Sequence, residues 1–310
     1  MIPDRTPLAR EWRPAWPCAP EQVLRPQRRG AGDPTQRTDD AGRTWRAMRT
    51  PVGAATLCVQ PRPRDGVVLG RAWGPGAEWA LDRMPGLLGA DDDPSGFVAH
   101  HPAVERGVRT RPHWRLGRTG LVMESLVPSI LEQKVTGKEA FGSFRKLVQR
   151  HGEPAPGPVE GLRLRVQPTA AAIAAVPSWE WLQLGVDPAR SRTVVTACRV
   201  ATSLERLVDL DHAEADRRLR SLPGIGVWTS AEVRQRALGD PDAVSFGDYH
   251  LANHVGWAIL GHDITDDEMA ELLEPYRPQR GRAAAMACAG GPTRPRRGPR
   301  MSLPTHLPTH

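Results

Sequence analysis

LRSLPGIGVWTSAEV, from Leu219 to Val233, is the stretch of sequence that decides the fold. It predicts a helix, a Leu-Pro-Gly-Ile-Gly turn and a second helix. Pro223 ends the first helix because it has no N–H and restricts the residue before it. Gly224 and Gly226 permit backbone geometries that other residues avoid. The stretch therefore predicts two helices joined as a hairpin.

The turn of this hairpin has the features of a phosphate-binding site. The free N–H groups and the positive dipole end of the second helix point into it, and the glycines let a phosphate come close. Leu222 and Ile225 are placed to anchor the turn in apolar core. A glycine-rich turn between two helices is also common without any ligand. The full Leu-Pro-Gly-Ile-Gly pattern in a basic chain favours binding to a phosphate backbone.

The composition is that of a globular protein with a basic surface. Hydrophobic residues make up 39% of the 310 residues and charged residues 25%, which is ordinary for a folded chain. The net charge of +7 and the pI near 9.9 favour a polyanionic partner. However, only Lys134, Lys138 and Lys146 are lysines, and a GC-rich genome would produce such an arginine bias by itself. The net charge alone therefore does not identify the binding partner.

Several classes of protein are disfavoured by what the sequence lacks. No stretch approaches the ~20 apolar residues of a membrane span, and no apolar signal core begins the chain, so we expect a cytoplasmic protein without membrane contact. The four cysteines are scattered and form no ligand pattern for zinc or an iron–sulfur cluster. They are Cys18, Cys58, Cys198 and Cys288.

Residues 1–118 are expected to form an N-terminal α+β domain. Residues 1–50 are rich in Arg, Pro, Gly and Trp and show no sustained helical period, so this basic N-terminus is predicted to be irregular. After it the sequence predicts strands over Ala54–Pro61 and Val67–Leu69, a turn at Asp65-Gly66 between them, and a short helix over Ala77–Met84.

Residues 119–290 are expected to form an all-α domain, which makes the protein mainly helical overall. Thr136 and Glu139 form a plausible capping box for a helix that runs to His151, and Asp211 suits an N-cap. Further helices are predicted over Thr169–Ala175, Pro188–Ala201, His212–Leu222, Val227–Leu238, Tyr249–Leu260, Asp266–Tyr276 and Gly281–Ala289. Residues 291–310 are expected to be a flexible basic tail.

The hairpin and the segment AVSFGDYHLANHV, from Ala243 to Val255, together resemble the helix-hairpin-helix DNA glycosylases. That superfamily carries a catalytic aspartate soon after the hairpin, and Asp248 lies twenty-two residues after Gly226. PSILEQKVTGKEAF, from Pro128 to Phe141, resembles the helix pair that opens their helical domain. The chain is most similar to the DNA-3-methyladenine glycosylase II branch, whose N-terminal α+β domain would account for the residues before about 118.

The resemblance implies that Asp248 is the catalytic carboxylate for hydrolysis of the N-glycosidic bond of a damaged base. This bond breaks through a sugar with oxocarbenium character. An ionised carboxylate stabilises that cation or orients the attacking water, and the residues do not choose between the two roles. An aspartate before a helix that begins at Tyr249 also suits an N-cap, which is compatible with catalysis.

The damaged base must leave the duplex and enter a pocket. The resemblance places Trp228 and Tyr249 near that pocket, where flat rings would stack on an electron-poor alkylated base; ordinary core packing is the alternative. Glu232 stands where the branch has an aromatic residue, and Cys288 falls near another lost aromatic. We therefore expect a pocket that is less aromatic and more acidic, which leaves the preferred lesion open.

The remaining contacts with DNA are implied by the same resemblance. Gln133 or Lys134 would fill the gap left by the base, and Lys134 with Lys138 would alternatively contact phosphates or simply face solvent. The hairpin residues expected at the DNA are Gly224, Ile225, Gly226 and Thr229. The resemblance also implies a monovalent cation on the backbone carbonyls of Arg220, Leu222 and Ile225.

We expect a monofunctional enzyme that removes alkylated bases from double-stranded DNA as a monomer, without a catalytic cofactor. Trp228 takes the position of the catalytic lysine of bifunctional glycosylases, and no lysine follows Lys146, so a Schiff-base step lacks a nucleophile. One alternative is a non-catalytic DNA-binding protein with the same fold. Another is a glycosylase for a different purine lesion.

Overall fold

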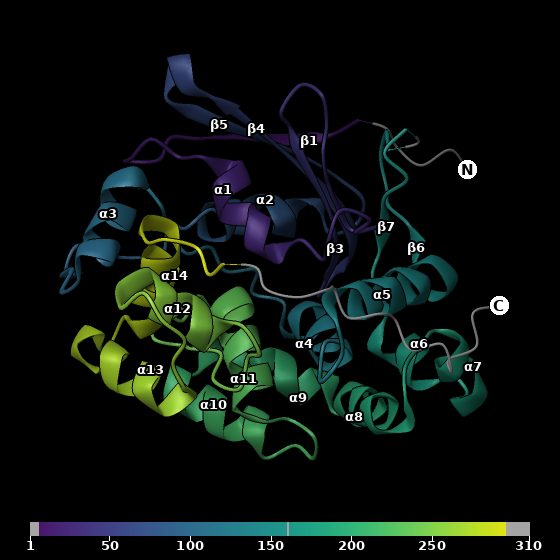
Figure 1. The fold of residues 1–310 in the computed structure, drawn as a ribbon. Coiled ribbons are helices and arrows are strands. Elements are labelled where there is room, and N and C mark those ends of the chain that lie inside the picture. The colour runs from purple at the N-terminus through teal and green to yellow at the C-terminus, as the bar shows by residue number, and fades with distance from the viewer. Residues whose placement is uncertain (1–5, 160, 296–310) are drawn as a thin grey trace.

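The computed structural model describes residues 6–159 and 161–295. Helices predominate, and a small antiparallel sheet lies at one end of the molecule (Figure 1). Residues 296–310 of the expected basic tail lie outside the described residues. In the described part of that tail, Arg294 forms an ion pair with Asp263 at 2.6 Å. Within the described part of the chain, no helix is long and apolar enough to cross a membrane.

The sheet has five strands in the order β1-β5-β4-β3-β2, all antiparallel. The strands are β1 (Leu8–Trp12), β2 (Gln36–Thr38), β3 (Thr44–Thr50), β4 (Gly53–Arg62) and β5 (Val67–Trp73). The expectation that residues 1–50 are irregular was wrong, because three strands and a helix lie within them. β3 is buried on both faces and therefore shows no alternation of apolar and polar residues in its sequence.

Each face of the sheet packs on a different part of the chain. α1 (Pro20–Leu24) and α2 (Ala77–Leu87) cover one face. On the other face Trp45 and Trp73 stack at 5.5 Å and meet apolar residues of segment 155–166. This segment follows β6 (Glu153–Pro154) and ends with β7 (Arg165–Val166). The region expected to be all helical therefore contains a short strand pair, because that segment completes the core of the sheet.

The helical core is built around α4 (Val122–Leu131), which is buried along nearly its whole length. The helices that follow it are α5 (Gly137–His151), α6 (Ala170–Ala174), α7 (Ser178–Gln183), α8 (Pro188–Arg199), α9 (Ala201–Glu205), α10 (His212–Arg220) and α11 (Val227–Val233). The capping box of Thr136 and Glu139 is present, and the Asp211 carboxylate accepts the Glu214 N–H at 2.8 Å, so both predicted caps are confirmed.

The last three helices pack with a helix from much earlier in the chain. They are α12 (Leu251–Ile259), α13 (Asp266–Leu273) and α14 (Arg280–Gly290), and α3 (Pro102–Thr110) lies against α14. Gly107 of α3 allows this contact, because a side chain there would overlap the Met286 carbonyl. The expected division at residue 118 stays a prediction, and α3, which precedes that boundary, packs with the helices that follow it.

Candidate active site

The predicted hairpin is present: α10 ends at Arg220 and α11 begins at Val227. Gly224 has a φ of +86°, which favours glycine, and a Cβ there would overlap Thr193. Ile225 is buried in the helical core. Gly226 is exposed, and a Cβ added to it would meet nothing within 4 Å. The turn therefore anchors Ile225 inward and leaves open space outside Gly226.

Gln133, just after α4, holds the hairpin in place. Its side-chain amide donates to the Gly224 carbonyl at 2.9 Å and to Thr229 Oγ1 at 2.8 Å. Thr229 is buried, so the structure makes it a support of the turn rather than an exposed contact. Lys134 is exposed and has a φ of +55°, a conformation that non-glycine residues adopt at a free-energy cost and that is common at functional loops.

Asp248 lies between the hairpin and the start of α12. Its Oδ1 accepts the N–H groups of His250 and Leu251, at 2.8 and 2.9 Å. Its Oδ2 accepts the Trp228 indole N–H at 3.3 Å. α12 begins at Leu251, two residues later than predicted, because the carboxylate takes the place of a helical acceptor. One oxygen thus caps the helix, and the other is bound by the hairpin.

Asp248 also lines a pocket of about 300 Å³ between α11, α12 and α14. This volume is at the lower end of the range of about 300–1,000 Å³ that small-molecule sites span. α14 contributes Gly281, Ala284 and Ala285, which have no side chain beyond Cβ and leave the space open. Among the described residues that line it there is no Trp, Tyr or Phe.

Glu232 is the predicted pocket residue that does line this space. It is 8% exposed, its Oε1 accepts the Ser245 hydroxyl at 2.6 Å, and its Oε2 pairs with Arg236. Arg236 Nε in turn donates to the Pro26 carbonyl at 3.1 Å. This part of the pocket wall is therefore acidic, but its charge is partly balanced by an arginine that the N-terminal segment helps to hold.

The other two predicted pocket residues lie outside the lining. Trp228 reaches the pocket through its hydrogen bond to Asp248. Tyr249 is 83% exposed and meets the His250 ring edge-on, because it precedes the first turn of α12 and points to solvent. Cys288, expected near a lost aromatic, does line the pocket.

Sequence reasoning missed His254, which lines the pocket together with Asp248. Leu251 and His254 are three residues apart on α12 and share a face, and that spacing was the available signal. Burial lowers the pKa of His254, the neighbouring His250 lowers it further, and Asp248 opposes both. The two imidazole rings stack at 5.7 Å.

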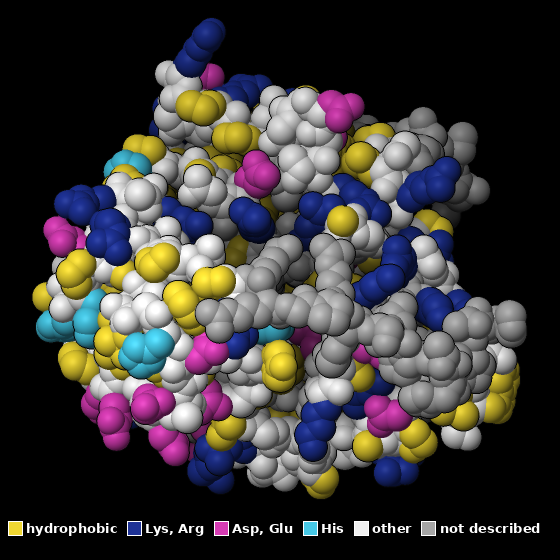
Figure 2. Space-filling view, viewed as in Figure 1, with side chains coloured by type: hydrophobic (Ala, Val, Ile, Leu, Met, Phe, Trp, Pro, Cys, Tyr) yellow, Lys and Arg dark blue, Asp and Glu magenta, His cyan; other side chains and the backbone are white. Residues whose placement is uncertain are grey.

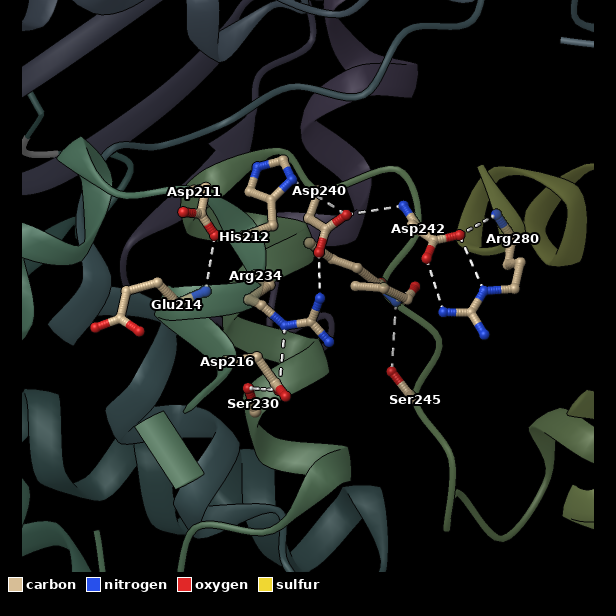
Figure 3. A network of polar contacts seen from close by, with 12 residues as sticks. Asp211, His212, Glu214, Asp216, Ser230, Arg234, Asp240, Asp242, Ser245 and Arg280 are labelled. Atoms are coloured by element: carbon tan, nitrogen blue, oxygen red, sulfur yellow. Dashed lines mark hydrogen bonds and ion pairs between the residues drawn. The ribbon is translucent and has the colours of Figure 1, made fainter. Parts of the chain in front are cut away.

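The loop that leads to Asp248 is tied on both sides by charge pairs (Figure 3). Arg234 pairs with Asp240 and lies 3.4 Å from Asp216 on α10. Arg280 of α14 binds Asp242 with Nη2 at 2.7 Å and Nε at 2.9 Å. Burial alone would raise the pKa of Asp242, but the hydrogen bonds from Arg280 outweigh it and hold the pKa below its ordinary value. These pairs fix the path of the chain toward the carboxylate.

Charge is unevenly distributed over the face that Figure 2 shows. Asp and Glu side chains gather over α13, whose first turn carries Asp266, Asp267 and Glu268. Lys and Arg side chains are more frequent over the middle and the opposite side of this face. A polyanion would therefore be favoured away from α13.

No protein-family model matches the chain. Over 177 residues it is 31% identical to a probable bifunctional transcriptional activator/DNA repair enzyme AlkA of Mycobacterium tuberculosis, a match that covers 56% of this chain and 35% of the relative. The same match is found in two strains. The chain thus spans about a third of the length of the curated relatives it matches.

The chain is homologous to AlkA. Its fold is that of the helix-hairpin-helix DNA glycosylases, so the resemblance expected from the hairpin is confirmed. A 3-methyladenine DNA glycosylase from Archaeoglobus fulgidus superimposes with a TM-score of 0.70 at 19% identity, covering 90% of this chain and 97% of that one. An 8-oxoguanine glycosylase/lyase from Clostridium acetobutylicum also reaches 0.70, at 11% identity, covering 94% and 100%. These identities establish the shared fold.

Proposed function

We propose that this AlkA homologue is a monofunctional DNA glycosylase that hydrolyses the N-glycosidic bond of an alkylated purine in double-stranded DNA. The observation that supports this proposal most directly is the position of the Asp248 carboxylate. It lines the pocket, with one oxygen hydrogen-bonded to the start of α12 and the other to the hairpin. In this proposal the sheet region is the N-terminal α+β domain, and the helices from α4 onward form the glycosylase core.

The chemistry follows from where the carboxylate lies. A base flipped into the pocket would place its sugar near Asp248. As the bond between C1′ and the base nitrogen breaks, its electron pair leaves with the base, and positive charge develops on the sugar. The carboxylate stabilises that charge, and water then adds to C1′ and loses a proton. The hydrogen bonds to both oxygens keep the group oriented before the reaction begins.

The pocket wall supports an alkylated purine as the substrate. A purine methylated at N3 or N7 carries a positive charge and an exocyclic amine, and Glu232 and Asp248 both offer carboxylate oxygens to it. The lack of Trp, Tyr and Phe in the described lining removes the stacking that would otherwise select an electron-poor ring. Recognition of the base in this proposal is therefore electrostatic. The ion pair between Arg236 and Glu232 weakens the attraction of Glu232 for a cationic base.

The hairpin is proposed to bind the DNA backbone around Gly226, and Lys134 to enter or flank the gap left by the base. No described residue donates a hydrogen bond to the carbonyls of Arg220 or Ile225, and the Leu222 carbonyl accepts only the Ile225 N–H at 3.1 Å. These three carbonyls therefore fit the monovalent cation that the fold family implies. Bound there, it would supply positive charge beside a phosphate.

The monofunctional part of the proposal rests on Trp228, which stands where a lyase lysine is needed, and on the absence of lysine after Lys146. Such an enzyme leaves an intact strand with an abasic site. Borohydride added during turnover should trap no covalent adduct with DNA above background. A trapped adduct on a lesion duplex would reveal an amine nucleophile and overturn this part of the proposal.

The deciding experiment measures abasic-site formation on duplexes that each carry one damaged base. We expect release of methylated purines from a strand that stays intact. Protein that binds every duplex and releases no base would instead be a non-catalytic DNA-binding protein, a reading that the non-aromatic pocket lining favours. Release of only deaminated or oxidised purines would mean that the protein is a glycosylase for a different class of lesion.

A further inference from the structure

Three arginines converge on a loop near the N-terminus, outside the pocket and the hairpin. Arg28 and Arg37 both donate to the Ala31 carbonyl, at 2.9 and 2.6 Å. Arg145 of α5 lies against the same loop, since a Cβ added at Gly32 would meet its Nη1 at 2.6 Å. Arg28 and Arg145 are exposed and Arg37 is half-buried, so their guanidinium groups remain accessible to a ligand.

These three arginines have no acidic partner among the described residues. Other arginines of the N-terminal region are paired with carboxylates: Arg29 with Glu132 at 2.7 Å, Arg43 with Asp39 at 2.7 Å, Arg46 with Glu124 at 3.1 Å and Arg49 with Glu153 at 2.5 Å. Three guanidinium groups without an acidic partner therefore meet at one loop. Like charges held together raise the free energy of the folded protein, and a bound anion would lower it.

Among the described residues, the carboxylate whose charge acts on Arg37 is that of Asp33, and it is already occupied. Both oxygens of Asp33 accept hydrogen bonds, from the Arg29 N–H at 2.6 Å and from the Thr35 N–H and hydroxyl at 2.7 and 2.8 Å. Burial lowers the pKa of Arg37, and the charges of Arg28 and Arg145 lower it further, with Asp33 only partly opposing them. The positive charge of the cluster is thus uncompensated.

The cluster lies beside the support of the hairpin. Arg29, next to Arg28, pairs with Glu132, and Glu132 precedes Gln133, whose side chain holds Gly224. The ring of Phe141 on α5 packs under the same loop, 2.7 Å from where a Cβ of Gly30 would be. Lys138 and Arg145 are seven residues apart and share the Phe141 face of α5. Basic groups therefore extend from Lys134 across α5 to this loop.

We propose that Arg28, Arg37 and Arg145 form a second phosphate-binding site, which contacts the DNA backbone on the other side of the α4–α5 turn from the hairpin. The site rests on the proposed function, because it needs DNA as its ligand. Arginine suits this role because its planar fork binds phosphate oxygens in pairs. It would lengthen the footprint without reading base sequence.

The test is the salt dependence of DNA binding by the full-length protein. Each phosphate contact adds about 0.9 to the slope of log affinity against log salt for duplex DNA. The triple variant Arg28→Ala, Arg37→Ala, Arg145→Ala should therefore lose about 2 to 3 from that slope, equally on damaged and undamaged duplexes. The single variant Arg145→Ala removes a side chain with no hydrogen bond to a described residue, and should lose about one.

A charge-matched control separates this site from a general loss of positive charge. Arg64, Arg83 and Arg109 are exposed and lie on other elements, so their triple alanine variant should keep nearly the wild-type slope. An unchanged slope in the cluster variant and in Arg145→Ala would refute the site. Saturable binding of inorganic phosphate that depends on the cluster, with an unchanged DNA slope, would make it a small-anion site instead. Wild-type protein that binds no duplex at all would refute the proposed function itself.

Discussion

The indole nitrogen of Trp228 lies 3.3 Å from Oδ2 of Asp248, which joins the hairpin directly to the candidate catalytic carboxylate. Trp228 lies on α11 and Asp248 precedes α12, so this hydrogen bond joins two elements through residues twenty positions apart in the chain. One oxygen of the carboxylate is thus hydrogen-bonded to α11 and the other to the start of α12. The position of the reacting group therefore depends on how the hairpin is packed.

Replacing Asp248 with Asn tests the catalytic carboxylate. Asn and Asp are comparable N-caps, so the start of α12 should stay intact. The variant loses the negative charge that stabilises the sugar cation, and base release should fall by on the order of 10²-fold or more. Single-turnover excision and thermal unfolding should be measured together. Loss of stability in parallel with activity would assign Asp248 to the cap alone.

Replacing Trp228 with Phe tests the hydrogen bond that orients Asp248. An aromatic ring, smaller than the indole, remains, but the N–H donor is removed. Hydrogen bonds to charged groups contribute about 1.5–3 kcal/mol, so single-turnover excision should slow by about tenfold or more. Affinity for a lesion duplex should be unchanged, because the hairpin surface is untouched. Equal losses in affinity and rate would instead indicate that the variant disturbs the hairpin.

Gly226 and Gly224 provide a matched pair of substitutions in the turn. Gly226 has an extended backbone with φ −96° and open space beyond it, so Gly226→Leu should fold and weaken binding to all duplexes by about tenfold. Gly224→Leu should lower the melting temperature, because its φ is positive and a side chain overlaps Thr193. A folded Gly226→Leu protein with normal affinity would mean that this turn does not approach DNA.

Glu232→Gln should change selectivity among lesions. The substitution keeps an acceptor for Ser245 and removes the charge that faces the pocket. Excision of N3- and N7-methylated purines, which are cationic, should fall relative to excision of neutral hypoxanthine, by about tenfold if one charged hydrogen bond is lost. Ser245→Ala leaves the pair of Glu232 and Arg236 intact and serves as the control. If the ratio of excision rates between these lesions is unchanged, Glu232 takes no part in recognising the base.

The pair of Asp242 and Arg280 should make stability depend on acid pH. The folded-state pKa of Asp242 lies below its ordinary value, so its contribution to stability is present above the unfolded-state pKa of about 3.9 and is lost as pH falls through the folded-state pKa. Asp242→Asn should therefore destabilise the protein at neutral pH and lose less stability on acidification. Chemical unfolding between pH 7 and pH 3 measures this difference.

The sequence by itself determined the hairpin, the caps and the position of Asp248 between hairpin and helix. These features are local: Pro223 ends one helix, Gly224 and Gly226 shape the turn, and Thr136 with Glu139 caps α5 through groups three residues apart. Short-range steric and hydrogen-bonding rules are sufficient to predict them. The family resemblance then assigned chemistry to the same residues.

Only the tertiary structure decided which side chains meet at the pocket and how the N-terminal region folds. β1 pairs with β5, about sixty residues away, so its strand is stabilised by a partner that no local pattern reveals. Tyr249 points to solvent because the Asp248 cap delays the start of α12, and Arg236, which pairs with Glu232 one helical turn away, also donates to the Pro26 carbonyl of the N-terminal segment. Burial, charge pairing and cross-strand hydrogen bonds join residues distant in the chain, and these contacts exist only once the chain has packed.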